Sequence, residues 1–341
     1  MILQHHNAVL EVQAMKKYFP IKKGFLKRTI GQVKAVDDVS FFIEQGETFG
    51  LVGESGCGKS TLGKSILRAI EPSDGSITFV NRKEEAVEVR DLDNKQLRDI
   101  RRDMQLIFQD PYSSLNPRMT VLNIIGEPLI CNGIAKGEEL KRRVGDLMDL
   151  VGLNRKHLER YPHAFSGGQR QRIGIARALA TDPKFLVCDE AVSALDVSIQ
   201  AQIINLLQSL QQKLNLSYLF ISHDLGVIQH ISDRVGVMYV GKMVEVAATD
   251  KLFSSPKHPY TEALLSAKPV PIPKQKRERI ILKGEVANPA NPPSGCYFHP
   301  RCLYAQDICK QQAPDFKEIE AGHFVACHMA KDLDLKGVKV Q

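Results

Sequence analysis

The feature that most constrains the fold of this chain is a glycine-rich segment, Gly53-Glu-Ser-Gly-Cys-Gly-Lys-Ser-Thr61, which fits the pattern G-x-x-x-x-G-K-[ST]. An apolar run, Thr48–Val52, precedes it and predicts a strand, and Lys59–Ile70 has apolar residues at helical spacing. In a strand–loop–helix setting the glycines let backbone N–H groups surround phosphate oxygens, and the helix N-terminus adds positive potential. The segment therefore predicts a nucleotide-binding P-loop.

Within this loop, Lys59 should reach the β- and γ-phosphates, and the hydroxyl of Ser60 should bind Mg²⁺. The candidate nucleotide-binding residues of the loop are Gly53, Glu54, Ser55, Gly56, Cys57, Gly58, Lys59, Ser60 and Thr61.

Strand and helix signals alternate through the first 250 residues or so. Further strands are predicted at Val33–Ile43, Met104–Phe108, Phe185–Cys188 and Ser217–Ser222, and further helices at Ile173–Ala180 and Ser198–Leu214. This alternation predicts an α/β fold with a mainly parallel sheet core, and with the P-loop it indicates a P-loop NTPase. Residues from about 85 to 165 depart from this alternation. They are charged and helix-biased, and they predict a helical insert within the α/β domain.

Composition supports a globular protein, since 43% of the residues are hydrophobic and 25% are charged. The net charge of +7 is compatible with a nucleotide, nucleic-acid or membrane-surface partner, and equally with ordinary solubility charge. No apolar run is long enough to predict a membrane-spanning helix. The first residues also lack the pattern of a secretory signal, so the chain is expected to remain in the cytoplasm.

A P-loop site also needs a carboxylate at the end of a neighbouring strand. The segment Phe185-Leu-Val-Cys-Asp-Glu190 supplies two, after four apolar residues. Asp189 is the candidate for holding Mg²⁺, through water, and Glu190 is the candidate for polarising the attacking water.

The segment Phe165-Ser-Gly-Gly-Gln-Arg-Gln-Arg172 resembles the signature sequence of ATP-binding cassette ATPases. Ser166 suits the cap of a helix whose free N–H groups face an anion. In that family the anion is the γ-phosphate held by a partner subunit, so that ATP lies between two chains. The resemblance therefore assigns Ser166, Gly167, Gly168 and Gln169 to nucleotide binding in trans.

Other family elements occur in order along the chain. By analogy Gln109 senses Mg²⁺ and the attacking water, and couples the site to the helical insert. Asp196, in Ser193-Ala-Leu-Asp196, lies in the loop that crosses the dimer interface, and His223 contacts the γ-phosphate and orients Glu190. An aromatic residue early in the chain should stack on adenine. Tyr18 and Phe19 are both candidates, and the spacing to the next strand favours Phe19.

A narrower resemblance comes from Phe108-Gln-Asp-Pro-Tyr-Ser-Ser-Leu-Asn-Pro-Arg118 and from Ser255-Pro-Lys-His-Pro-Tyr-Thr-Glu-Ala-Leu-Leu265. Both are similar to segments of dipeptide, oligopeptide and nickel importer ATP-binding subunits. The resemblance implies an ATPase that drives peptide uptake from the cytoplasmic face of the cell membrane as a peripheral subunit. It implies as partners two transmembrane permeases, a second cassette subunit, which in this family is more often a paralogue than an identical chain, and an extracytoplasmic substrate-binding protein, with no nucleic acid.

Two alternatives remain at this stage. One is a nickel or other small-solute importer of the same family. The other is a soluble cassette ATPase that acts on nucleic acid or ribosomes, with which the positive net charge is compatible. The absence of long coiled coils or zinc inserts, and of a second cassette in the chain, speaks against the latter.

The last ninety residues have a composition of their own. Ten of the seventeen prolines lie beyond residue 250 and four of the seven cysteines beyond residue 290. This change in composition predicts a cassette over residues 1–255, a C-terminal extension over residues 256–341, and a linker at about residues 268–280.

Cys296, Cys302, Cys309 and Cys327 lie in a segment with few apolar residues, so they predict a metal centre that holds it together. Their spacing leaves zinc and iron–sulfur open, as well as scattered buried cysteines. The family resemblance favours a 4Fe–4S cluster. Further candidate zinc ligands are His299, His323 and His328, each of which also suits a surface or packing role. The three remaining cysteines, Cys57, Cys131 and Cys188, are expected to have no catalytic role.

Overall fold

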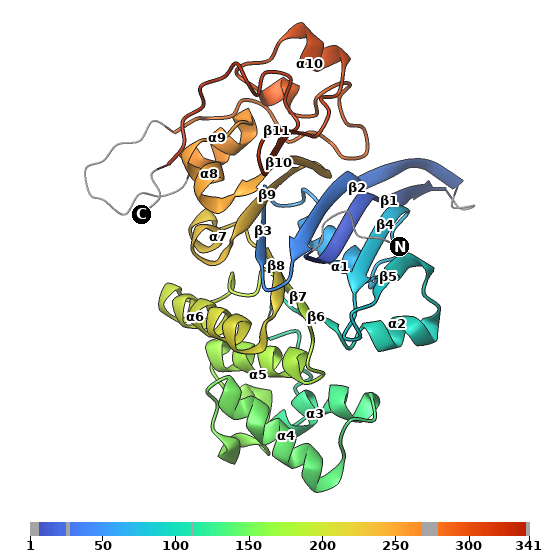
Figure 1. Ribbon diagram of the computed structural model, residues 1–341, viewed down its shortest axis with the longest axis vertical. Helices are drawn as coiled ribbons and strands as arrows, with labels where there is room; N and C mark the ends of the chain where they lie inside the picture. The colour runs from blue at the N-terminus through green and yellow to red at the C-terminus, as the bar shows by residue number, and fades with distance from the viewer. Residues whose placement is uncertain (1–6, 25–27, 111, 268–278, 339–341) are drawn as a thin grey trace. The chain divides into compact units, whose positions relative to one another are not determined.

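The computed structural model describes residues 7–24, 28–110, 112–267 and 279–338 (Figure 1). The chain divides into two compact units, each built from separate segments. Unit 1 comprises residues 1–9, 43–47 and 79–221, and unit 2 comprises 10–42, 48–78 and 222–341. Most of the predicted linker, residues 268–278, lies outside the described residues.

Unit 1 contains a parallel sheet in the order β8-β7-β6, made of β6 (Met104–Ile107), β7 (Phe185–Asp189) and β8 (Ser217–Ile221). Val187 lies opposite Leu106 on one side and Leu219 on the other. Every residue of β7 and β8 is buried, as expected for parallel strands covered on both faces. The predicted strands of this unit are confirmed to within one residue at their ends.

The helices α3 (Val121–Cys131), α4 (Gly137–Leu150) and α5 (Gly167–Leu179) contact one another and form the green group of Figure 1. The long helix α6 (Val197–Leu214) packs on α5. The range predicted to be helical, residues 85–165, contains α2 (Asn94–Ile100), α3 and α4. It also contains two strands, β5 (Ala86–Glu88) and β6. β6 belongs to the parallel sheet described above, whereas β5 is the end strand of a separate four-stranded sheet.

Unit 2 holds two groups of strands. The first, in the order β2-β1-β4, is made of β1 (Ala8–Lys23), β2 (Arg28–Glu44) and β4 (Asp74–Val80), apart from the two residues at one end of each strand that belong to unit 1. The second has the order β11-β12-β10-β9-β3, from β3 (Thr48–Val52), β9 (Arg234–Tyr239), β10 (Lys242–Ala248), β11 (Lys317–Glu320) and β12 (His323–Val325).

The expectation of a mainly parallel sheet is wrong for this second group of strands. β3 and β9 are parallel, but the other three pairings are antiparallel. The cause is local. A two-residue turn with positive φ at Val240 and Gly241 reverses the chain after β9, a geometry that favours a tight hairpin. The C-terminal hairpin β11–β12 then adds to β10, so the cassette has a mixed sheet.

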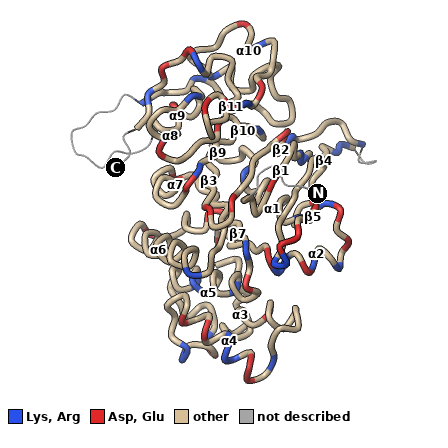
Figure 2. Tube along the Cα trace, in the orientation of Figure 1, with Lys and Arg blue, Asp and Glu red and all other residues tan. Residues whose placement is uncertain are grey.

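The helices of unit 2 are short: α1 (Lys59–Ile66), α7 (Leu225–Ile231), α8 (Thr249–Ser254), α9 (Pro259–Ser266), α10 (Asp307–Gln311) and the 3₁₀ turn η4 (His299–Arg301). α1 begins where predicted and ends four residues earlier than the predicted Ile70. In the described part of the chain no helix combines the length and apolar character needed to cross a membrane. Figure 2 shows charges of both signs on α4.

Candidate active site

The loop between β3 and α1 has a backbone that only glycine can adopt at two positions. Gly53 and Gly58 have φ angles of 153° and 108°. A Cβ on Gly53 would lie 2.1 Å from the carbonyl oxygen of Met238, and a Cβ on Gly58 would lie 2.0 Å from that of Ala35. Gly58 is also the N-cap of α1, so the glycines bring the backbone to the start of a helix, as phosphate binding requires.

Lys59 lies within this loop rather than extending into solvent. Its side chain is buried, and Nζ donates hydrogen bonds to the carbonyl oxygens of Gly53 (2.8 Å) and Glu54 (3.0 Å). The thiol of Cys57 lies beside it, and burial raises the pKa of this thiol despite the lysine charge. The ammonium group is thus held at the loop, while Cys57 is a neutral packing residue.

The two aromatic candidates on β1 have different surroundings. The Tyr18 hydroxyl donates a hydrogen bond to Asp37, and burial together with this carboxylate raises the pKa of Tyr18, which keeps it protonated. The ring of Phe19 is 37% exposed and has the ammonium group of Lys17 at 4.8 Å from its centre. Phe19 therefore has an accessible ring face, whereas Tyr18 is engaged in the fold.

In unit 1, the two carboxylates lie at the end of β7 as expected. Asp189 is the last residue of the strand and is buried. Glu190 has a φ of 49°, an unusual conformation for a residue other than glycine, and its N–H donates to the carbonyl oxygen of Ile221 at 3.0 Å. Gln109, just after β6, donates from Nε2 to Glu190 Oε2 at 2.7 Å. Strained residues of this kind concentrate at functional sites.

The signature segment starts α5, and the predicted cap is confirmed. Ser166 Oγ accepts the N–H of Gln169, and the side chain of Gln169 accepts the N–H of Ser166, which is a complete capping box. A Cβ on Gly168 would lie 2.5 Å from Cγ2 of Ile199, so α5 and α6 approach closely here. Asp196, the N-cap of α6, is exposed and makes no capping hydrogen bond with its side chain.

His223 lies in unit 2, between the end of β8 and α7, and is exposed. The next residue, Asp224, caps α7 by accepting the N–H groups of Gly226 and Val227. The structure thus places the phosphate loop, Phe19 and His223 in one unit, and Gln109, the two carboxylates and the signature in the other.

Sequence reasoning missed a group of residues that contact the nucleotide-binding elements within unit 2. Arg301 forms a double hydrogen bond with the carboxylate of Glu54, and the hydroxyl of Tyr260 accepts the N–H of Glu54. The hydroxyl of Tyr297 donates to Asp37, the same carboxylate that holds Tyr18. No spacing or periodicity connects these residues to the P-loop in the sequence, so no local signal could have revealed them.

The four C-terminal cysteines line one hollow of unit 2, together with His258, Phe298, His299 and His328. Burial raises the pKa of Cys302 to about 11 and that of Cys327 to about 12, so both thiols are neutral at physiological pH. The predicted metal centre is not supported: among the residues placed by the structure, no group of three or more His, Cys, Asp or Glu is arranged to hold a metal ion.

One zinc-ligand candidate is corrected. His323 is completely buried, and its Nε2 lies 2.8 Å from Oε1 of Glu245. That carboxylate also accepts the backbone N–H groups of Lys257 and His258. His323 is therefore a packing residue in a buried polar cluster, because its ring joins β12 to β10 rather than facing the cysteines.

Comparison with known proteins agrees with this geometry. Residues 36–193 match the family described as ABC transporter, and residues 244–309 match the oligopeptide/dipeptide transporter C-terminal region. The chain is 53% identical over 332 residues to the oligopeptide transport ATP-binding protein AppF of Bacillus subtilis, covering 96% of this chain and 99% of that protein. It is 48% identical to the dipeptide transport ATP-binding protein DppF of Haemophilus influenzae, covering 95% and 98%.

Solved structures show the same cassette fold. The ATP-binding cassette MJ0796, in a dimeric post-hydrolysis state bound to ADP and phosphate, superposes with a TM-score of 0.60 at 27% identity and covers 70% of this chain and 98% of its own. With relatives of about 50% identity along nearly the whole chain, this protein belongs to the family of oligopeptide and dipeptide ABC importer ATP-binding subunits, ATPases whose hydrolysis of ATP is coupled to transport.

Proposed function

We propose that ATP binds with its phosphates on the loop Gly53–Thr61 and its adenine on the ring of Phe19. The observation that carries this proposal is the glycine-only backbone at Gly53 and Gly58, which opens directly into α1. Lys59 is held at the same loop by its hydrogen bonds to two carbonyl oxygens, and it supplies positive charge to the β- and γ-phosphates. The exposed face of Phe19 supports its role in stacking.

Glu190 is the general base of the proposed hydrolysis. Its carboxylate accepts a hydrogen bond from the side-chain amide of Gln109, and this contact orients the group that would polarise the attacking water. His223 is proposed to orient the same carboxylate and to contact the γ-phosphate. The left-handed backbone at Glu190 supports a functional role, since such strain persists only where the surrounding structure maintains it.

The signature is proposed to act on the nucleotide of a second cassette subunit. Ser166 and the following Gly167, Gly168 and Gln169 form a capped helix start, where a negatively charged phosphate is stabilised. Exposed Asp196 is proposed to lie at the interface with that second subunit.

Mg²⁺ is expected with ATP, and the available donors suit it, because Ser60, Gln109 and Asp189 all offer oxygen atoms. When bound, the ion would neutralise charge on the β- and γ-phosphates. Asp189 is a buried carboxylate at the end of β7, a position from which an acidic group can hold a cation through water.

The variant Glu190→Gln tests the proposed base. It keeps the shape of the side chain and removes its basicity, so hydrolysis should fall by about 10²–10⁴-fold while ATP still binds. Measurements of phosphate release and of ATP affinity separate the two effects, with Lys59→Ala as the variant that should lose binding. Steady turnover near the wild-type rate in Glu190→Gln would refute the role of Glu190.

The finer parts of the transport assignment are also proposals. They comprise two permeases, a second cassette that is a paralogue, a substrate-binding protein, and a position at the cytoplasmic face of the membrane. The names of the relatives AppF and DppF support peptides as cargo over nickel or another small solute. Mild extraction of the tagged chain, with identification of the proteins that co-purify, tests the partners.

The division into a cassette of residues 1–255 and an extension of residues 256–341 is also a proposal.

The hollow lined by four cysteines is proposed to take a 4Fe–4S cluster, with zinc as the alternative. The argument for it is the hollow that the four cysteines share and the thiol donor set, whereas the arrangement of these side chains in the described residues does not itself form a metal site. Because burial raises the pKa of Cys302 and Cys327, binding would have to release protons from these two thiols. Iron, sulfide and zinc content of the protein purified without oxygen should distinguish the two, and Cys302→Ser should lower whichever is found. Absence of all three from the wild-type protein would refute both.

A further inference from the structure

The short segment from Cys296 to Cys302 connects two regions of unit 2. Cys296, Phe298, His299 and Cys302 line the cysteine hollow. Two of the three intervening residues, Tyr297 and Arg301, instead contact elements of the proposed nucleotide site. Within this single stretch of seven residues, some side chains line the hollow and others contact the nucleotide-binding elements.

The contact of Arg301 with the P-loop is close and mostly buried. Its Nη1 and Nη2 lie 2.7 Å and 3.1 Å from the two oxygens of Glu54, and its side chain is only 9% exposed. This two-bond geometry is specific to arginine and fixes the orientation of the carboxylate. Glu54 follows Gly53 directly, and its backbone carbonyl oxygen accepts one of the Lys59 hydrogen bonds. Arg301 thus restrains a residue of the loop that holds Lys59.

The backbone of Glu54 is restrained from the same side. Its N–H donates to the hydroxyl oxygen of Tyr260 at 2.8 Å. The Tyr260 ring packs against Phe298 and Tyr239, with ring centres 5.3 Å and 4.7 Å away. Phe298 is itself part of the connecting segment, so the side chain and the backbone of Glu54 are both tied to it.

A second contact reaches the strand that carries Phe19. The hydroxyl of Tyr297 donates to Oδ2 of Asp37 at 2.9 Å, and Tyr18 donates to Oδ1. Burial by itself would raise the pKa of Asp37, but the hydrogen bonds from both tyrosines and the charges of Lys242 and Lys34 lower it, so the carboxylate is ionised. Asp37 therefore joins the connecting segment to the neighbour of the proposed adenine-stacking residue.

We propose that Arg301 and Tyr297 are positioning residues of the ATP site, and that the C-terminal extension thereby sets the affinity of the P-loop for nucleotide. This inference rests on the proposed site at Gly53–Thr61. Arg301 acts through Glu54 on the phosphate loop, and Tyr297 acts through Asp37 and Tyr18 on the adenine side. Neither residue contacts the nucleotide itself.

The variant Arg301→Met tests the first contact, because it keeps an apolar stem of similar volume and removes the guanidinium group. We expect the Kd and KM for ATP to rise about tenfold, the usual scale of coupling between two sites, with a smaller change in kcat. Arg301→Lys keeps the charge but not the two-bond geometry, so its Kd for ATP should lie between that of the wild type and that of Arg301→Met. Tyr297→Phe, which removes only one hydroxyl, should raise the Kd by a smaller factor of about 2–5.

The matched control is Lys251→Met. Lys251 also forms an ion pair with the extension, at 2.7 Å from Glu320, but has no contact with Glu54 or Asp37 in the hydrogen bonds and ion pairs of the described residues. It should leave the Kd for ATP unchanged. The double variant Arg301→Met with Glu54→Gln should bind ATP only slightly more weakly than either single variant, since both changes remove the same contact.

All affinities are measured with the full chain, below the unfolding temperature of each variant. An unchanged Kd in both Arg301→Met and Arg301→Lys would overturn the inference, as would an equal rise in Lys251→Met. The variant Lys59→Ala distinguishes a failure of the proposed nucleotide site from a failure of the positioning role. If it binds ATP as well as the wild type, the proposed nucleotide site itself is wrong. If it loses binding while the Arg301 variants bind normally, only the positioning role is refuted.

Discussion

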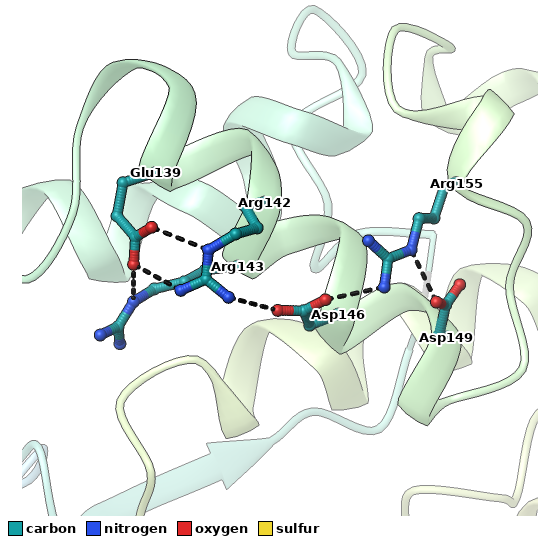
Figure 3. A network of polar contacts seen from close by, with 6 residues as sticks. All are labelled: Glu139, Arg142, Arg143, Asp146, Asp149 and Arg155. Atoms are coloured by element: carbon teal, nitrogen blue, oxygen red, sulfur yellow. Dashed lines mark hydrogen bonds and ion pairs between the residues drawn. The ribbon is translucent and has the colours of Figure 1, made fainter.

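The two units offer contrasting examples of ionic groups. In unit 2, some of these groups are enclosed: Glu245 and His323 are completely buried, and Arg301 is nearly so. In unit 1, α4 carries an exposed network, shown in Figure 3, in which Glu139 binds both Arg142 and Arg143. Asp146 continues the network by accepting hydrogen bonds from Arg142 and Arg155.

Buried and exposed charged groups contribute differently to stability. A buried carboxylate must have its hydrogen bonds satisfied within the protein, and Glu245 accepts three, from two backbone N–H groups and one imidazole. Removing a partner there leaves an uncompensated buried group. An exposed pair exchanges its partner for water at little cost, so the α4 network contributes little to stability. Burial, rather than the number of ion pairs, should therefore decide the effect of each substitution.

The largest effect on stability is expected at the buried cluster. Glu245→Ala leaves two backbone N–H groups and His323 without their acceptor, and we expect a loss of about 3–5 kcal/mol in the free energy of unfolding. Denaturant unfolding of the full chain measures it. Glu245→Gln keeps one acceptor oxygen and should cost less. An equal free energy of unfolding for Glu245→Ala and the wild type would show that burial of a charged group does not decide how much its removal destabilises the protein.

An intermediate case lies in unit 1 and tests whether burial or the choice of unit matters. Asp103 is buried, but its partner Arg82, which also donates to the carbonyl oxygen of Thr181, is about 40% exposed on its side chain. Arg82→Met should destabilise the protein by about 1–2 kcal/mol, because Asp103 retains the backbone N–H of Arg82 as a donor. If unfolding shows a loss as large as in Glu245→Ala, the graded dependence on burial is wrong.

The smallest effect is expected on α4. Glu139→Gln removes a charge that two arginines hold, and their hydrogen bonds lower the pKa of Glu139 to about 2. Because the folded pKa lies below the ordinary value of 4.5, the stabilisation is present above pH 4.5 and is lost as the pH falls toward 2. At pH 7 and physiological salt the unfolding temperature should change little.

A difference between Glu139→Gln and the wild type should therefore emerge only at low salt and should vanish once the pH has fallen through about 2. Thermal unfolding at two salt concentrations and at two pH values checks this expectation. A large, salt-independent loss at pH 7 would mean that the α4 network is more strongly coupled than its exposure indicates.

Much of the nucleotide site could be predicted from the sequence because its signals are local. The P-loop, the strand Thr48–Val52 before it, and the acids at the end of Phe185–Asp189 all follow from patterns within a few residues. The Ser166 cap is a signal of the same kind, since the capping box spans only four positions. Local hydrogen bonds and periodicity determine such elements, so the structure reproduces them.

Only the tertiary structure decided what surrounds these elements. The contact of Arg301 with Glu54 joins residues 247 positions apart, and no periodicity encodes it. The sequence also presented His323 as a possible ligand, whereas the fold encloses it against Glu245. The antiparallel strands beyond β9 depend on a turn at Val240 and Gly241 and on a distant hairpin. Such features come from chain segments meeting in three dimensions, where burial and long-range packing override local preference.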